Sequence, residues 1–236
     1  MMKLRLIPLV FLWLVSSYCI AETLVIRTGL EEASKGFQIA RSLADEIQRR
    51  TDLTIDFIHL PSKRSLNYLE SGIIDGEWSR VANFGTELPG LIRISEPVAT
   101  HYYIAYTINK DIVIDSWESL KPYSVAYLRG WTVIDNKLGS VHNNLIPVNS
   151  VEAGLNFITA GRADVFVSIP FFVDEVLNHR EWKGSTIRAL QAPVDSLNVY
   201  IYLLPKHAVA GIKIVDALKS MKADQSYDEI INGSPE

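Results

Sequence analysis

The sequence has a single cysteine, Cys19, and no second thiol with which it could form a disulfide. The fold must therefore be held by a hydrophobic core, which 236 residues are enough to build. Basic runs are absent, and the formal net charge of −4 argues against nucleic acid or an anionic membrane as a partner. No apolar stretch after residue 21 is long enough to be a transmembrane helix.

Several motifs of enzymes and metalloproteins are missing as well. No histidine has the spacing of a metal ligand with another histidine or a cysteine. Gly-x-Ser-x-Gly, Walker and Gly-x-Gly-x-x-Gly motifs do not occur. The sequence therefore predicts no metal and no cofactor.

The chain begins with what reads as a secretion signal. Lys3 and Arg5 precede an apolar run, Leu6–Val15, which is too short to span a bilayer with these flanks. Cys19-Ile20-Ala21 has small residues at both positions that a signal peptidase reads, so we expect cleavage after Ala21 and a periplasmic protein. The alternative is a lipoprotein acylated on Cys19, but the bulky Tyr18 stands where a small residue should precede it.

The rest of the chain alternates short β-branched runs with helical periods. Leu24–Thr28 and Thr54–Leu60 read as strands, and between them apolar residues from Phe37 to Ile47 recur at helical spacing. This βαβα order predicts an α/β fold with largely parallel sheets covered by helices. The pattern repeats after residue 110, which predicts a second lobe with strands at 123–128, 145–148, 165–169 and 186–190.

Two segments, 66–75 and 155–164, match each other within the chain. Each reads as the end of a helix, a glycine and, three residues later, an aspartate where a strand begins. The glycines suit a left-handed cap that stops a helix. Because any helix-to-strand junction favours these residues, chance explains one short match about as well as an internal repeat does.

Short motifs carry a resemblance to a known family. They are Gly161-Arg162-Ala163-Asp164, Ile94-Ser95-Glu96-Pro97 and the strand-then-glycine segment Val125-Ala126-Tyr127-Leu128-Arg129-Gly130, together with the secretion signal. Over nearly all of its mature length the chain resembles the bacterial extracellular solute-binding proteins of family 3, whose members include receptors of amino-acid ABC transporters.

The resemblance implies a type II periplasmic-binding-protein fold with two lobes, each a mostly parallel sheet covered by helices. Two strands would cross between the lobes, at 102–108 and 199–204. Lobe one would comprise 22–109 plus 197–236, and lobe two 110–196. The ligand of such proteins lies between the lobes, which close around it by a hinge motion.

The segment 75–80 should lie at the carboxyl end of a strand, which is the binding edge of an open α/β sheet. Arg80 is our first candidate for an anion clamp, because a guanidinium holds a carboxylate through two parallel hydrogen bonds and the family uses an arginine in this region. The alternative is a surface arginine paired with Glu77 or Glu87. Glu77 would order Arg80 or bind a ligand cation, with Trp78-Ser79 beside it.

Further candidates come from both lobes. Arg64 lies at the start of a helix that follows a strand, so it is a second candidate clamp. In lobe two, Arg129-Gly130-Trp131-Thr132 leads into a helix whose free amide groups would bind an anion, with Trp131 stacking on the ligand or anchoring the helix. Tyr103 and Ser168 complete the expected ligand-binding residues.

One departure from the family concerns the ligand. Amino-acid receptors of the family carry an aspartate near the end of the strand after the second Gly-x-x-Asp junction, but Val165–Pro170 contains no carboxylate. This difference disfavours an ordinary α-amino acid. Aromatic residues near the expected cleft suggest a ligand with a flat or apolar portion: Trp78, Tyr102, Tyr103, Phe171 and Phe172.

The resemblance implies a monomer that captures a small polar, anionic or zwitterionic solute for an ABC-type permease. One alternative is a soluble sensory partner of a membrane receptor, which would use the same closed form. Another is a dehydratase-like enzyme on the same scaffold, for which Glu77 and His101 are the plausible general acids.

The secretion signal makes a direct prediction about processing. The mature N-terminus should be Glu22, because cleavage follows Ala21. Mass spectrometry of an envelope fraction checks this, and an intact Met1 or a lipid on Cys19 would contradict it.

Overall fold

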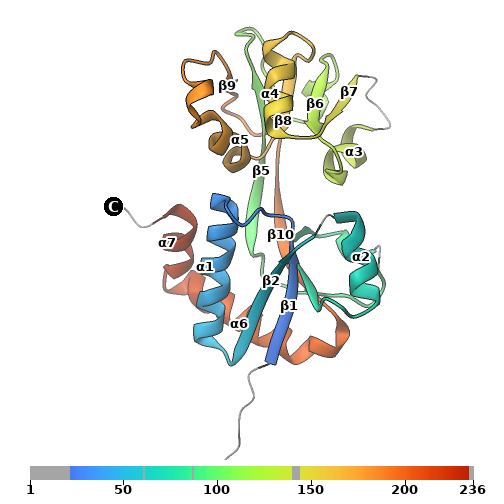
Figure 1. The fold of residues 1–236 in the computed structure, drawn as a ribbon, viewed down its shortest axis with the longest axis vertical. Coiled ribbons are helices and arrows are strands. Elements are labelled where there is room, and N and C mark those ends of the chain that lie inside the picture. The colour runs from blue at the N-terminus through green and yellow to red at the C-terminus, as the bar shows by residue number, and fades with distance from the viewer. Residues whose placement is uncertain (1–21, 61, 87, 140–143, 234–236) are drawn as a thin grey trace, which may run out of the picture.

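The computed structural model describes residues 22–60, 62–86, 88–139 and 144–233. The expected signal peptide, residues 1–21, lies outside this part of the chain. The described residues form two α/β lobes joined by two long strands, as expected (Figure 1). No helix in these ranges is long and apolar enough to cross a membrane.

The first lobe is organised around β1 (Glu22–Thr28), a strand whose central aliphatic residues are largely buried. β2 (Leu53–His59) and β3 (Gly76–Val81) pair with β1 in parallel on its two sides. The short β4 (Ile92–Arg93) pairs with β10. The helices of this lobe are α1 (Lys35–Arg50), α2 (Ser62–Glu70), α6 (Ala208–Ala223) and α7 (Ser226–Asn232).

The second lobe has a sheet in which β8 (Val165–Ser168) and β7 (Leu145–Val148) flank β6 (Val125–Leu128), all in parallel. The strand expected at 186–190 is only the two-residue β9 (Arg188–Ala189), because it pairs with just two residues of β5. The helices of this lobe are α3 (Thr132–Leu138), α4 (Val151–Thr159) and α5 (Pro170–Leu177). Short 3-10 turns occupy 84–86, 118–120, 180–182 and 205–207.

Two long strands, β5 (Ala99–Thr107) and β10 (Asp195–Leu203), connect the lobes (Figure 1). They pair with each other in antiparallel fashion, and β10 continues beside β3 while β5 continues beside β8. Both begin earlier than the expected crossings at 102–108 and 199–204. The additional residues, 99–101 and 195–198, belong to the segments through which the two strands pair with each other, from Ala99 opposite Val199 to Tyr103 opposite Asp195.

Each lobe has its own hydrophobic core on both faces of its sheet. In the first lobe Leu24 and Ile26 of β1 belong to one cluster and Val25 packs against another. In the second lobe Val165 and Val167 belong to one cluster and Phe166 to another. This alternation follows from the two-residue period of a strand that is covered on both faces.

The two matching segments, 66–75 and 155–164, have the same structure. Gly72 and Gly161 have left-handed φ angles of 69° and 65°, which a residue with a β-carbon rarely adopts. Asp75 accepts a hydrogen bond from the backbone N–H of Val25 at 3.0 Å, and Asp164 accepts one from that of Ser124 at 2.7 Å. The match therefore includes a contact between distant segments, which a helix-to-strand junction alone does not require.

Asp75 also joins a polar cluster that binds the first strand to the start of α6. One carboxylate oxygen lies 2.7 Å from His207 Nε2 and 2.8 Å from Lys206 Nζ. His207 Nδ1 in turn lies 2.6 Å from Glu22 Oε1. Burial raises the pKa of Asp75, but the hydrogen bonds from Lys206, Val25 and His207 outweigh it and hold this pKa below its ordinary value.

Replacing Asp75 by asparagine should lower the free energy of unfolding by about 1–3 kcal/mol at about pH 7, because charge-assisted bonds are lost. A carboxyl whose pKa is lowered in the folded state contributes stability above its unfolded pKa, and this contribution is lost as the pH falls through the folded value. The difference between wild type and Asp75→Asn should therefore shrink at about pH 3. Urea titrations at both pH values measure this difference in the free energy of unfolding, with the exposed Asp216→Asn as control. A difference between wild type and Asp75→Asn that is the same at both pH values would contradict the ionic role.

Candidate functional site

A cavity of about 380 Å³ lies between the two lobes. Its walls come from residues within four segments, 27–30, 78–84, 130–136 and 169–172, together with His59, Leu60, His101, Tyr103 and Val199. Among the described residues that line it, Arg27 and Arg80 are the charged ones apart from histidine, and neither aspartate nor glutamate is present. The size is within the range of small-molecule sites.

The two arginines share one buried carboxylate, that of Glu77. The parallel register of β1 and β3 places Arg27 opposite Glu77, and Arg27 Nη1 lies 3.3 Å from Glu77 Oε2. Arg80 Nε lies 2.7 Å from the same oxygen. Glu77 is fully buried, so this cluster carries two positive charges and one negative charge at the wall of the cavity.

A β-bulge explains why Glu77 and Arg80 meet. In a regular strand, residues three apart point to opposite faces of the sheet. Here Tyr202 of β10 pairs with Glu77 and Tyr200 pairs with Arg80, so two residues of β3, Trp78 and Ser79, oppose one residue of β10. Ser79 takes a φ of 62°, a strained angle for a residue other than glycine.

Arg27 is held deep in the lobe. Its Nε donates to the backbone oxygen of Leu60 at 2.7 Å, and its side chain is only 5% exposed. Burial lowers the pKa of Arg27, the positive charge of Arg80 lowers it further, and Glu77 raises it. An arginine stays protonated even so, which means that Glu77 stabilises a buried charge.

Arg80 is oriented from three sides. Besides the bond to Glu77, Nη2 donates to the hydroxyl of Ser65 in α2 at 3.2 Å. The guanidinium carbon lies 4.6 Å from the centre of the Phe84 ring, a cation–π contact. Its side chain is 18% exposed and lines the cavity.

Ser79 and His101 connect β3 to the crossing strand β5. The hydroxyl of Ser79 lies 3.3 Å from His101 Nε2, and both residues line the cavity. Burial lowers the pKa of His101 to about 4. His101 is therefore a neutral imidazole at neutral pH.

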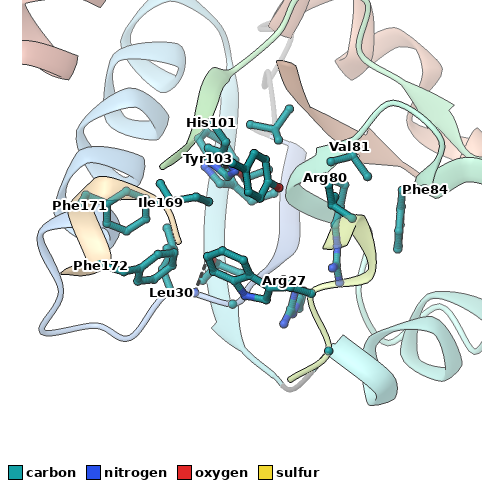
Figure 2. Close-up of a pocket in the computed structure, with 18 of the residues that line it drawn as sticks. Arg27, Leu30, Arg80, Val81, Phe84, His101, Tyr103, Ile169, Phe171 and Phe172 are labelled. Atoms are coloured by element: carbon teal, nitrogen blue, oxygen red, sulfur yellow. Dashed lines mark hydrogen bonds between the residues drawn. The ribbon is translucent and has the colours of Figure 1, made fainter. Parts of the chain in front are cut away.

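Aromatic rings form the side of the cavity that belongs to the second lobe. Trp131 packs between two of them, with ring centres 6.1 Å from Tyr103 and 5.7 Å from Phe172. The Phe171 and Phe172 rings lie 4.0 Å apart. Figure 2 shows Phe171 and Phe172 across the cavity from Arg27 and Arg80, with Tyr103 and His101 between the two sides.

The structure brings most of the expected site residues to this cavity. Trp78, Ser79, Arg80, Tyr103, Gly130 and Trp131 line it. Glu77 lies behind the wall and orders Arg80, one of the two roles expected for it. The side chain of Thr132 lies outside what the structure describes.

Three expected residues do not line the cavity. Arg64 is exposed on α2. Arg129 is also exposed and turns toward β7, where it donates to Asn149 at 3.1 Å and to the backbone oxygen of Pro147 at 3.2 Å. Ser168 is fully buried within β8, in the strand that pairs with β5.

Sequence reasoning missed Arg27. The sequence pattern predicts this residue only as part of a strand, although a lone arginine after Leu24, Val25 and Ile26 is unusual in a strand expected to be covered on both faces. That contrast was the available signal. Of the aromatic residues expected near the cleft, Tyr102 does not line this cavity and is 51% exposed.

The two candidate general acids have different environments. Glu77 is bonded to two guanidinium groups and does not reach the cavity, so proton donation to a ligand would require it to leave both. His101 does reach the cavity, but a group with a pKa of about 4 is a weak source of protons at neutral pH.

No protein-family model matches the chain. Over 177 residues it is 30% identical to an uncharacterized protein of Shewanella oneidensis, a match that covers 72% of this chain. The chain spans 65% of the length of that relative.

Solved structures match over most of the chain. One is a probable amino-acid ABC transporter extracellular-binding protein from Bacillus subtilis, with a TM-score of 0.68, 18% identity and coverage of 89% of this chain and 96% of that one. Another is an ancestral amino acid-binding protein described as a precursor of cyclohexadienyl dehydratase, with a TM-score of 0.64, 17% identity and coverage of 89% and 93%. The chain therefore has the type II periplasmic-binding-protein fold.

The low pKa of His101 makes a prediction about stability. The unfolded chain takes up a proton near the ordinary value of 6.5 and the folded chain only near about 4, so stability should fall as the pH drops between these values. His101→Gln should remove this loss, on the order of 1–3 kcal/mol. Thermal unfolding from about pH 7 to about pH 4 measures it. The exposed His179→Gln should behave as wild type, and an unchanged pH profile for His101→Gln would contradict a lowered pKa.

Proposed function

We propose that this protein is a periplasmic solute-binding protein that captures a small anionic ligand in the cavity between its lobes and delivers it to an ABC-type transporter. The observation that carries the proposal is the cluster of Arg27, Glu77 and Arg80, which gives the cavity wall an excess positive charge. The solved structures that resemble this one include amino-acid-binding proteins, and this similarity supports a solute-binding role.

An anion is the ligand that this wall favours electrostatically. The Coulomb attraction between a carboxylate and a guanidinium grows as water leaves a closing cleft, because the effective dielectric constant falls. Arg80 reaches the cavity while Glu77 and Ser65 hold it in place, so little side-chain freedom is lost on binding. Such preorganisation favours affinity.

Capture requires the lobes to move as units, with lobe one at 22–109 plus 197–236 and lobe two at 110–196. The crossing strands β5 and β10 supply the hinge. Near the hinge the lobes already touch, because a β-carbon on Gly36 of α1 would lie 2.6 Å from the Phe171 ring of α5. Closure would bring the aromatic side toward the arginines.

Two other functions share this scaffold. A sensory partner of a membrane receptor would use the same anion-bound closed form. A dehydratase-like enzyme is favoured by one observation, the similarity to the precursor of cyclohexadienyl dehydratase. Within the described cavity lining, the imidazoles of His59 and His101 are the groups besides tyrosine that can exchange a proton near neutral pH, so such an enzyme would depend on one of them.

A thermal-shift screen of amino acids, monocarboxylates, dicarboxylates, amines and small peptides identifies a ligand for the test, since ligands of the folded state raise its melting temperature. Arg80→Ala should then weaken binding of the selected anion by about 2–5 kcal/mol, because the anion is left without its partner. Arg80→Lys should weaken binding less, since the charge stays but the planar fork is lost. Calorimetry well below each melting temperature measures both.

The matched control is Arg64→Ala, which removes an exposed arginine of the same lobe that does not line the cavity. Its affinity should equal that of wild type. Arg80→Ala is also expected to unfold at a lower temperature, because Glu77 loses a partner. Wild-type affinity in a folded Arg80→Ala protein would overturn the proposed clamp.

A further inference from the structure

We propose that the ligand is an amphipathic monocarboxylate with an aromatic ring and no ammonium group. This inference rests on the proposed anion-binding function and specifies the class of ligand. It follows from the opposite chemistry of the two sides of the cavity: arginines on one and a continuous set of rings on the other (Figure 2).

The wall of the cavity offers little that could bind an ammonium group. Among the described lining residues no carboxylate is present, and the nearby Glu77 is already bonded to two guanidinium groups. Neutral hydroxyl, imidazole and amide groups compensate the desolvation of an ammonium less well than a carboxylate does. A zwitterionic amino acid would therefore leave its ammonium group poorly compensated in the closed cleft.

The charge of the wall acts in the same direction. Arg27 and Arg80 with Glu77 have a net charge of one positive unit, which attracts a carboxylate and repels an ammonium group. His101 adds no charge of its own at neutral pH, because its lowered pKa keeps the imidazole neutral. One carboxylate neutralises this excess.

The aromatic side determines the rest of the ligand. Trp131, Phe172 and Phe171 form an uninterrupted series on this side in which each ring contacts the next, and Tyr103, between the two sides, contacts Trp131 at one end of it. Their edge-to-face and tilted packing gives one apolar wall, on which a flat ring can stack. Ile169 and Val133 extend the wall with aliphatic surface.

Aromatic rings also bind cations, so a cationic ligand has to be weighed. A cation–π contact is a modest attraction, whereas the guanidinium groups across the same cavity oppose any cation. The structure already uses this contact for its own cation, since Arg80 lies over Phe84. The balance favours a neutral ring on the aromatic side.

Four small molecules separate these possibilities. Hydrocinnamate has a phenyl ring and a carboxylate; L-phenylalanine adds an ammonium group to it; phenethylamine is L-phenylalanine without its carboxylate; and propionate is hydrocinnamate without its ring. In calorimetry with the full mature chain, hydrocinnamate should bind roughly tenfold or more tightly than each of the other three.

A pair of variants tests the aromatic side. Phe172→Ala should weaken hydrocinnamate roughly tenfold while changing propionate little, because only the ring touches that wall. Tyr102→Ala is the matched control: it removes an exposed ring that lies beside Tyr103 in sequence but does not line the cavity. Equal effects of the two variants on hydrocinnamate would overturn the role of the aromatic side.

The remaining outcomes separate this inference from the proposed function. If L-phenylalanine or propionate bound as tightly as hydrocinnamate, the proposed ligand class would be wrong. Anion capture would still stand if Arg80→Ala abolished the binding of that molecule. Phenethylamine binding most tightly would overturn both. If no probe bound, the ligand class would be wrong, and the proposed function would then be decided by the screened anion and Arg80→Ala.

Discussion

The structure of the site depends on one buried carboxylate shared by two guanidinium groups. Glu77 has no exposed surface, and its Oε2 accepts from both Arg27 and Arg80. Without Glu77 the two arginines would repel each other in a largely buried region, and removing one partner of a buried pair typically costs about 3–5 kcal/mol. With it, the cluster is stable enough to sit at the cavity wall and still has an excess positive charge to offer a ligand.

A second constraint, the bulge in β3, decides where that charge points. Because Trp78 and Ser79 oppose a single residue of β10, Arg80 returns to the side of Glu77 and faces the second lobe. The strain at Ser79, with its φ of 62°, is the cost of this arrangement. Bulges commonly re-aim side chains next to functional sites. The backbone geometry of β3 and the buried charge cluster are in this way parts of one arrangement.

Much of the fold could be predicted from the sequence, because β-branched runs and helical periods report local structure directly. The site was predictable where a residue followed a recognisable junction, as Arg80 and Trp131 do, or lay in an expected crossing strand, as Tyr103 does. Arg27 could not be placed, since its partner is set by the register of β1 against β3, a property of the folded sheet. Arg64 and Arg129 were expected in the cleft from their positions at or just before the start of a helix. Arg64 is instead exposed on α2, and hydrogen bonds to Asn149 and Pro147 turn Arg129 toward β7. No glycine marks the bulge, so the sequence contained no sign of it.

The proposed ligand would lie with its anionic group against Arg80 and its aromatic ring against Phe171 and Phe172. A crystal structure of the mature protein grown with para-bromohydrocinnamate tests this placement directly, because anomalous scattering locates the bromine without reference to any assumed pose. We predict a bromine peak beside the two phenylalanine rings and the carboxylate within hydrogen-bonding distance of the Arg80 guanidinium. A bromine peak beside Arg27 and Arg80, with the carboxylate directed to solvent, or a cleft closed without the ligand, would contradict the account.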